Sequence, residues 1–266
     1  MNETAEMFFD HFGVSPGSSA GDIHGIAEAY STIPWENLTK FLLRASGNPQ
    51  PRLPREVMEG HISRGTGGTC YSLTETLATI IVQCGLRARP LTGHMNHGRN
   101  IHCALLVEGE AGSFILDPGY AVPGAVRLAE DHSGELALEG RTMRWKPVPE
   151  GWELHTIEHG QSRYRYTLES RQLTRAEFME YWRRSFNAPG LESLHLNMPG
   201  PMGGRMSAHN GNLRTVDSAG SRNLKLASDY GRLVSESFGI APEVAEAAWA
   251  ELQRQKLARR GQDVTS

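Results

Sequence analysis

Cysteine is scarce in this sequence, which holds only three in 266 residues, at positions 70, 84 and 103. So few thiols, and an odd number of them, do not make the disulfide framework of a small secreted protein. Residues 1–12 carry Glu3, Glu6 and Asp10 and lack the basic start and apolar core of a signal peptide. We therefore expect a cytoplasmic protein whose thiols are reduced and free for chemistry.

The sequence also lacks an excess of charge of one sign and a long apolar run. It has 27 Lys and Arg residues against 30 Asp and Glu residues, and the formal net charge is -3. This balance gives no electrostatic reason to expect nucleic acid or an anionic membrane as a partner. No apolar run approaches the roughly 20 residues that span a bilayer. We therefore expect the partner to be a small molecule.

In the first third of the chain, apolar residues recur at the spacing of an α-helix. Apolar residues recur every three or four positions over 21–43, and again after Pro54, a good first residue of a helix. The glycine-rich run 64–68 interrupts this pattern. A strongly amphipathic helix follows from Leu73 and stops at Gly85, a residue that favours helix ends.

Short strand-like runs replace the helical spacing in the centre and predict a β-sheet or barrel. These runs are 89–91, 100–108, 113–117, 153–158 and 163–168. In the last third, Thr174 and Glu177 form a capping box that predicts another helix. The other elements predicted there are strands at 212–216 and 221–226, helices at 228–238 and 242–256, and a loop or linker at 199–212, which is rich in Gly, Pro and Met.

Cys70 falls at the first turn of the helix predicted after the glycine-rich run. A thiol attacks only as a thiolate, and the unpaired N–H groups and dipole of a helix N-terminus favour that anion. The same N–H groups could hold the oxyanion of a tetrahedral intermediate. The alternative is that Cys70 is a small buried residue. We interpret Cys84 and Cys103 in that way, since each lies on the apolar face of its predicted element.

His102 lies in a predicted strand, where its side chain points to the face opposite Cys103 and could reach a cleft. A histidine there can act as a base, although a single histidine on a strand is also often structural. Asp117 ends a predicted strand and is followed by Pro118, which places a carboxylate beside a turn. It could fix the tautomer of the histidine, or serve only the turn.

Four short motifs occur in order along the chain. They are Ile33-Pro34-Trp35-Glu36-Asn37-Leu38, Arg64-Gly65 through Cys70-Tyr71, Ile101-His102-Cys103-Ala104-Leu105-Leu106-Val107, and Leu116-Asp117-Pro118-Gly119-Tyr120. Together they resemble the motifs of the arylamine N-acetyltransferase family. The likeness extends over nearly the whole chain, because the tail from Phe178 to Ile240 also follows that family in outline.

The resemblance implies an α+β fold around a cysteine-proteinase-like core. It divides the chain into an N-terminal helical bundle with the nucleophile (1–85), a central antiparallel β-barrel (86–172) and a C-terminal α/β lid (173–266). The histidine and the aspartate of the site would both come from the barrel.

The resemblance further implies that Cys70, His102 and Asp117 form a catalytic triad of the kind shared with transglutaminases, with no metal. Glu36 and Arg64 would form a structural ion pair. The residues that we expect to bind substrate are Trp35, Gly68, Thr69, Tyr71 and Tyr120.

The reaction that the resemblance implies is a ping-pong acyl transfer. Acetyl-CoA, or another acyl thioester, would acylate the thiol as a cosubstrate, with no resident cofactor. An arylamine or arylhydrazine would then take the acetyl group.

Two other interpretations remain open at this point. The loop before Cys70 is two residues longer than the family form, which would suit an amide synthase that takes a polyketide or other acyl chain from an acyl carrier protein. A zinc site or non-catalytic binding site built from Cys70, His102 and Cys103 is disfavoured, because adjacent strand residues diverge and the sequence has no Cys-x-x-Cys pair.

Overall fold

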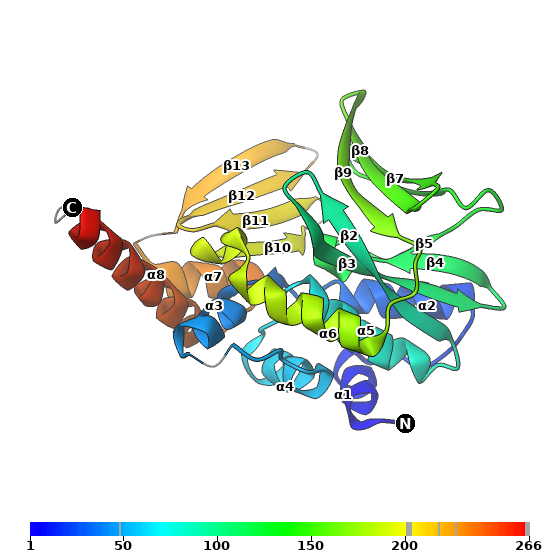
Figure 1. Ribbon diagram of the computed structural model, residues 1–266, viewed down its shortest axis with the longest axis horizontal. Helices are drawn as coiled ribbons and strands as arrows, with labels where there is room; N and C mark the ends of the chain where they lie inside the picture. The colour runs from blue at the N-terminus through cyan, green and yellow to red at the C-terminus, as the bar shows by residue number, and fades with distance from the viewer. Residues whose placement is uncertain (48, 201–203, 218, 227, 264–266) are drawn as a thin grey trace.

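Helices make up most of the first third of the protein, and local sequence signals mark their ends. Asn2 caps the first helix by accepting a hydrogen bond from Ala5 N, and Gly13 ends it in the left-handed conformation. In this computed structural model the described residues are 1–47, 49–200, 204–217, 219–226 and 228–263 (Figure 1). The early helices are α1 (Glu3–Phe12), α2 (Ala20–Tyr30), α3 (Leu38–Ala45), α4 (Pro54–Arg64) and α5 (Cys70–Val82), and the short strand β1 (Trp35–Glu36) precedes α3. The prediction of a helical first third is confirmed.

Eight antiparallel strands form a nearly closed barrel in the centre of the chain, in the order β5-β4-β3-β2-β9-β8-β7-β6. A backbone bridge between Leu128 and Gly134 joins the two ends of this order. The strands are β2 (Arg87–Met95), β3 (Gly98–Gly109), β4 (Gly112–Leu116), β5 (Ala125–Arg127), β6 (Gly134–Leu138), β7 (Arg141–Val148), β8 (Gly151–Glu158) and β9 (Gln161–Glu169). The predicted barrel is therefore present. The sequence prediction missed β5, β6 and β7. In β7 only Met143 and Trp145 are fully buried, among polar neighbours, which weakens the strand pattern.

A second antiparallel sheet has the order β1-β10-β11-β12-β13, and it lies beside the barrel (Figure 1). The loop or linker that the sequence predicts at 199–212 is wrong in part, because β11 lies within it. Asn210 and Gly211 make the tight turn between β11 and β12, and this pair is a strong hairpin signal. Residues 201–203 of the stretch lie outside the described residues. The strands are β10 (His195–Pro199), β11 (Arg205–His209), β12 (Asn212–Asp217) and β13 (Gly220–Lys225).

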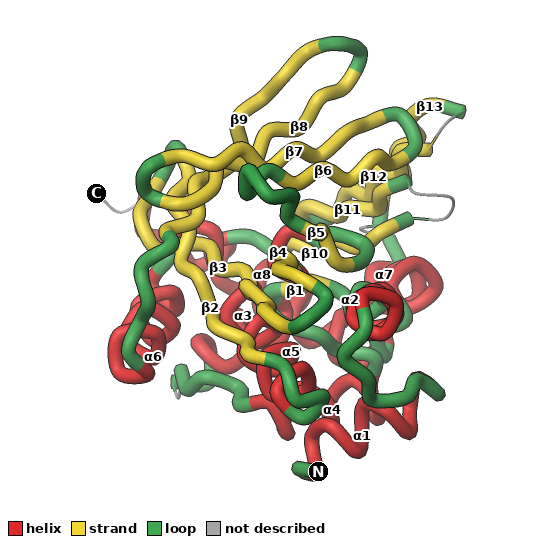
Figure 2. Tube along the Cα trace, turned by 90° about the vertical axis from the view of Figure 1, so that its right-hand side faces the viewer, coloured by secondary structure: helices red, strands yellow, loops and turns green. Residues whose placement is uncertain are grey.

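Most helices lie on one side of the molecule, with most of the strands on the other (Figure 2). The predicted capping box is confirmed: Thr174 Oγ1 accepts from Glu177 N at 3.2 Å, and Glu177 Oε2 accepts from Thr174 N at 2.8 Å. The helices are α6 (Arg175–Arg184), α7 (Tyr230–Phe238) and α8 (Pro242–Asp263), with short 3-10 turns η1 (Pro118–Tyr120), η2 (Ser185–Asn187) and η3 (Pro189–Glu192). None of the described helices is both long and apolar enough to cross a membrane.

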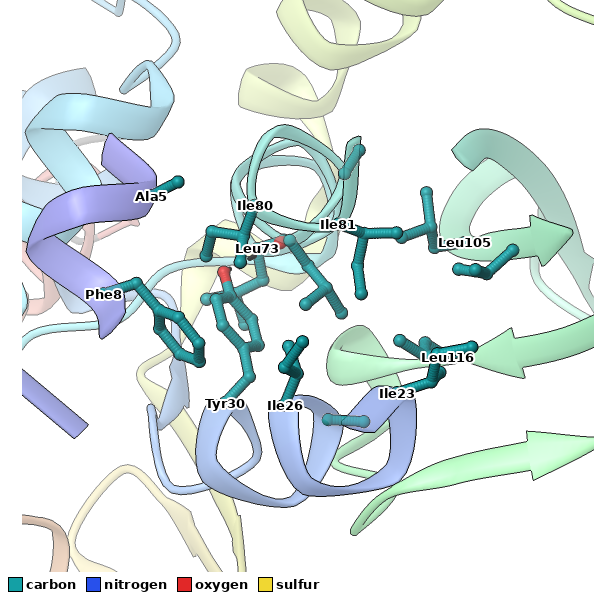
Figure 3. Close-up of a cluster of buried hydrophobic side chains, with 14 of the residues drawn as sticks. Ala5, Phe8, Ile23, Ile26, Tyr30, Leu73, Ile80, Ile81, Leu105 and Leu116 are labelled. Atoms are coloured by element: carbon teal, nitrogen blue, oxygen red, sulfur yellow. Dashed lines mark hydrogen bonds between the residues drawn. The ribbon is translucent and has the colours of Figure 1, made fainter. Parts of the chain in front are cut away.

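Helix α5 runs through the main hydrophobic core, which fixes its N-terminus in space. Its Leu73, Ile80 and Ile81 pack against α1, α2 and the barrel strands β3 and β4 (Figure 3). Tyr30 of α2 donates its hydroxyl to Leu73 O at 2.8 Å. Each fully buried aliphatic side chain contributes about 1.5 to 3 kcal/mol. The residue at the start of α5 is therefore held by a rigid element.

The segment Trp35–Ala45 connects the N-terminal part of the chain to its last third. Trp35 pairs with Asn197 of β10 in the second sheet. Leu38 and Phe41 of α3 are buried in the cluster formed mainly by α7, α8 and the second sheet. The division of the chain at residues 85 and 172 into separate units remains a prediction.

Candidate active site

Cys70 is the first residue of α5 and lines a cavity of about 530 Å³. The residue is 7% exposed. Thr69, the N-cap residue, makes no side-chain hydrogen bond to the first turn of the helix. The N–H groups of that turn can therefore hold an anion at the cavity wall.

His102 on β3 and Asp117 just after β4 form a buried pair. His102 Nε2 lies 2.9 Å from Asp117 Oδ2, and the two residues are 2% and 1% exposed. Gly93, opposite His102 on β2, gives the imidazole room, since a Cβ there would meet His102 Cδ2 at 3.2 Å. Because Nε2 faces the carboxylate, Nδ1 is the ring nitrogen left for the thiol.

Gly119 allows the thiol and the imidazole to come together. A Cβ at this position would lie 2.5 Å from Cys70 Cβ and 3.0 Å from His102 Cε1, so only a hydrogen atom fits there. The structure thus brings the three predicted catalytic residues to one point, from a helix N-terminus, a strand and a strand end. This order of nucleophile, base and orienting carboxylate is the arrangement that activates a nucleophile.

Two further groups donate hydrogen bonds to Asp117, and the sequence analysis predicted neither contact. Tyr166 on β9 donates its hydroxyl to Asp117 Oδ2 at 2.5 Å, and Trp145 Nε1 donates to the Tyr166 oxygen at 3.1 Å. Tyr120 N donates to Asp117 Oδ1 at 2.9 Å. The Tyr166 ring also stacks on His102, with centroids 4.5 Å apart. In the sequence Tyr166 is one aromatic residue of a strand, and no local pattern marks its contact with Asp117.

The electrostatics of the site favour a thiolate beside an imidazolium. A hydrogen bond from the Cys103 thiol and the hydrogen bond and charge of His102 together outweigh burial and hold the pKa of Cys70 well below its ordinary value. Burial lowers the pKa of His102, but Asp117 and Cys70 raise it more, to about 10. Burial raises the pKa of Cys103 well above its usual range, so this thiol stays neutral and donates. Cys103 is buried, as its place among apolar strand residues predicts, yet it also belongs to the site.

Lys40 on α3 also lies at the cavity wall, and the sequence analysis missed it. Its ammonium donates to Ser185 Oγ at 2.5 Å and lies 4.7 Å from the centroid of the Phe186 ring. Burial lowers the pKa of Lys40 to about 8, although the charge of Cys70 partly offsets this. In the sequence, Lys40 looks like any polar residue of an amphipathic helix.

The glycine-rich loop before Cys70 is held against β1. Glu36 N donates to Gly68 O at 3.0 Å, and Gly68 N donates to Pro34 O at 3.4 Å. A Cβ at Gly67 would lie 1.8 Å from Pro34 O, so this close approach requires glycine. The second motif of the sequence therefore packs directly on the first.

The expected ion pair between Glu36 and Arg64 is wrong. Arg52 Nη1 lies 3.9 Å from the buried Glu36 Oε1 and donates to Gly67 O at 2.9 Å, whereas the side chain of Arg64 is exposed at the end of α4. Arg52 precedes α4, and its guanidinium reaches both the loop and Glu36. Thr39 N and Oγ1 also donate to the Glu36 carboxylate, at 2.9 and 2.7 Å.

The cavity includes three of the five residues that we expected to bind substrate. Trp35, Thr69 and Tyr120 line it. Tyr71 does not, because it is fully buried between α5 and α6, where its ring lies 5.3 Å from that of Phe178. Gly68 does not line it either, since a Cβ there would point at Ser72 Oγ, 2.2 Å away. For the residues that the structure describes, no three His, Cys, Asp or Glu side chains are arranged to hold a metal ion.

Several solved structures share this fold. The arylamine N-acetyltransferase of Salmonella typhimurium superposes with a TM-score of 0.79 and 17% identity, covering 94% of this chain and 99% of the other. The M. smegmatis enzyme gives a TM-score of 0.80 and 19% identity, covering 94% and 98%. The Mycobacterium marinum enzyme, solved in complex with CoA, gives a TM-score of 0.78 and 15% identity, covering 93% and 99%.

The sequence comparison identifies a family rather than a single relative. No curated protein matches the chain. The family model described as N-acetyltransferase matches residues 24–240. This range includes all four motifs and the cavity wall from Trp35 to Arg205. The chain belongs to the arylamine N-acetyltransferase family.

Proposed function

We propose that this protein transfers an acetyl group from acetyl-CoA to the nitrogen of an arylamine or arylhydrazine, through a thioester on Cys70. The observation that carries the proposal is the Cys70–His102–Asp117 arrangement at the N-terminus of α5, on the wall of a cavity. Family membership supports acetyl transfer as the reaction class.

In the first half-reaction the Cys70 thiolate attacks the thioester carbonyl carbon of the donor. The N–H groups of the first turn of α5 can hold the oxyanion that forms. As the tetrahedral intermediate collapses, the C–S bond to CoA breaks and His102 gives its proton to the CoA sulfur. The products are S-acetyl-Cys70 and free CoA.

In the second half-reaction the amine attacks the carbonyl carbon of S-acetyl-Cys70. His102, now neutral, takes the proton that the amine nitrogen loses. The C–S bond to Cys70 breaks, the amide leaves, and the thiolate and imidazolium form again. Asp117 keeps the imidazole oriented through both steps and stabilises its charged form.

Intact mass spectrometry of the protein with acetyl-CoA, in the absence of any amine, tests this function. We expect one acetyl adduct on the wild type, none on Cys70→Ser, and loss of the adduct when an arylamine is added. If the wild type forms no adduct while Cys70 still reacts with iodoacetamide, acetyl-CoA is not the donor. A carrier-bound acyl thioester, as in an amide synthase, would then be the next donor to test.

A further inference from the structure

Basic side chains are prominent on the wall of the active-site cavity, and the Cys70 thiolate is the negative group among them. Lys40, Arg141 and Arg205 line it, together with His97 and His195. Within the described part of the chain, no Asp or Glu side chain lines this cavity. Neither a neutral arylamine nor the transferred acetyl group carries a negative charge that would complement these cations.

The two arginines come from different sheets and converge on the cavity. Arg141 is the first residue of β7 in the barrel, and Arg205 is the first residue of β11 in the second sheet. Both are partly buried, and in the described residues neither has a carboxylate within 4.0 Å. Burial and then the charge of Arg205 lower the pKa of Arg141, and together they outweigh the charges of Tyr120 and Glu158, which raise it. Two partly buried cations repel each other, and an anion placed between them would relieve this repulsion.

Tyr120 connects the arginines to the reacting groups. Its ring meets the His102 ring edge to face, with centroids 6.3 Å apart. Burial raises the pKa of Tyr120, while the charges of Arg165, Arg205 and Arg141 lower it, and Tyr120 lines the same cavity as Arg141 and Arg205. Arg165 donates to Thr156 Oγ1 and is absent from the cavity wall, which leaves Arg141 and Arg205 as the groups open to a ligand.

We propose that Arg141 and Arg205 bind an organic carboxylate carried by a substrate, one aromatic ring away from the Cys70 thioester. This deepens the proposed function, on which it rests for the reaction itself. The carboxylate can belong to the acceptor, as in an aminobenzoate, or to the acyl group, as in the thioester of a dicarboxylic acid. Guanidinium groups recognise carboxylates through paired, charge-assisted hydrogen bonds.

The acceptor arm compares 4-aminobenzoate with the neutral 4-aminobenzamide, using acetyl-CoA as donor. We expect the wild type to have the higher kcat/KM for aminobenzoate. Arg141→Met and Arg205→Met should each lower the ratio of the two kcat/KM values by about 10- to 100-fold, the effect of a hydrogen bond to a charged group. Arg144→Met is the matched control, since Arg144 lies on the same strand but pairs with Glu135 on the surface, at 2.7 Å. It should leave the ratio unchanged.

The donor arm measures acylation of Cys70 without amine, using acetyl-CoA and succinyl-CoA. If the acyl group carries the carboxylate, succinyl-CoA acylates the wild type faster, and this advantage disappears in Arg141→Met and Arg205→Met. The proposal is overturned if neither arm shows a preference for the carboxylate. It is also overturned if both variants slow acylation by acetyl-CoA and succinyl-CoA equally, since the arginines would then bind the phosphates of CoA.

A binding measurement separates failure of this site from failure of the proposed function. Calorimetric titration with benzoate needs no turnover. Benzoate should bind the wild type and Arg144→Met and bind Arg141→Met at least about 10-fold more weakly. If Cys70 forms no acetyl adduct but this difference in benzoate binding remains, the proposed function fails and the carboxylate site stands. If all three proteins bind benzoate equally, the site fails whatever the reaction.

Discussion

The pKa values of two buried side chains decide the chemistry of Cys70. The pKa of the thiol is held well below its ordinary value, chiefly by Cys103 and His102, and that of His102 is raised to about 10. The thiolate therefore forms as pH rises through the lowered pKa of Cys70, and its imidazolium partner is lost only as pH rises through about 10. Between these limits the ion pair persists.

The pH dependence of alkylation follows from this ion pair. The rate at which iodoacetamide labels Cys70 should change little from neutral pH upward in the wild type, until the pH approaches the His102 pKa of about 10. In His102→Ala the thiol loses its cationic neighbour, so the rate should be lower at neutral pH and rise towards the ordinary thiol pKa of about 8.5. Mass spectrometry at a series of pH values gives the rates, with Cys70→Ser as the blank for Cys84 and Cys103. A steep rise with pH in the wild type would contradict the ion pair.

At the scale of elements, the position of α5 depends on how the preceding loop is held. Glu36 is completely buried, and Arg52 is the cation beside it. Arg52 also donates to Gly67 O and Thr66 Oγ1, at 2.9 and 3.4 Å, so one guanidinium joins β1, α4 and the loop. Removing it would leave Glu36 buried with only the hydrogen bonds from Thr39.

The matched pair Arg52→Met and Arg64→Met tests this role. Breaking a buried ion pair from one side lowers stability by about 3 to 5 kcal/mol, because the remaining charge is unpaired. We expect a loss of about that size in the free energy of unfolding for Arg52→Met. Arg64→Met should change it by less than about 0.5 kcal/mol, as exposed substitutions do. Urea unfolding of the purified variants measures both losses of free energy of unfolding. Equal losses would contradict the role of Arg52 as the partner of Glu36.

At the scale of the whole molecule, the N-terminal and C-terminal parts of the chain share one sheet and one apolar cluster. β1 is an edge strand of the second sheet, and α3 packs against α7 and α8. Both parts of the chain contribute to the cavity wall, because Trp35 and Lys40 line it together with Arg205. The stability of the last third therefore depends on residues near position 40.

Phe41→Ala tests this dependence. Phe41 is fully buried, and removing a buried aromatic side chain lowers stability by about 3 to 5 kcal/mol. Leu224→Ala in β13 is the control, since Leu224 is 49% exposed and should lose less than about 0.5 kcal/mol. Urea midpoints, followed by circular dichroism, give the comparison. A small loss for Phe41→Ala would mean that α3 does not support the C-terminal sheet.

The sequence by itself determined the elements that carry strong local signals. Helix α5 shows amphipathic spacing, α6 has the capping box of Thr174 and Glu177, and the barrel strands around His102 and Asp117 are rich in apolar residues. The motif residues were sufficient to predict which thiol, imidazole and carboxylate meet. Each of these signals can be recognised within a short stretch of sequence, because helix caps, periodicity and short motifs involve residues that are close in the chain.

Only the tertiary structure decided which distant residues meet these groups. Tyr166 reaches Asp117 from β9, Arg52 takes the place expected for Arg64, and Arg141 and Arg205 line one cavity from two different sheets. Each of these residues is an ordinary strand or loop residue in the sequence. Their roles come from burial and from long-range packing, in which an unpaired buried charge or carboxylate must find a partner far along the chain.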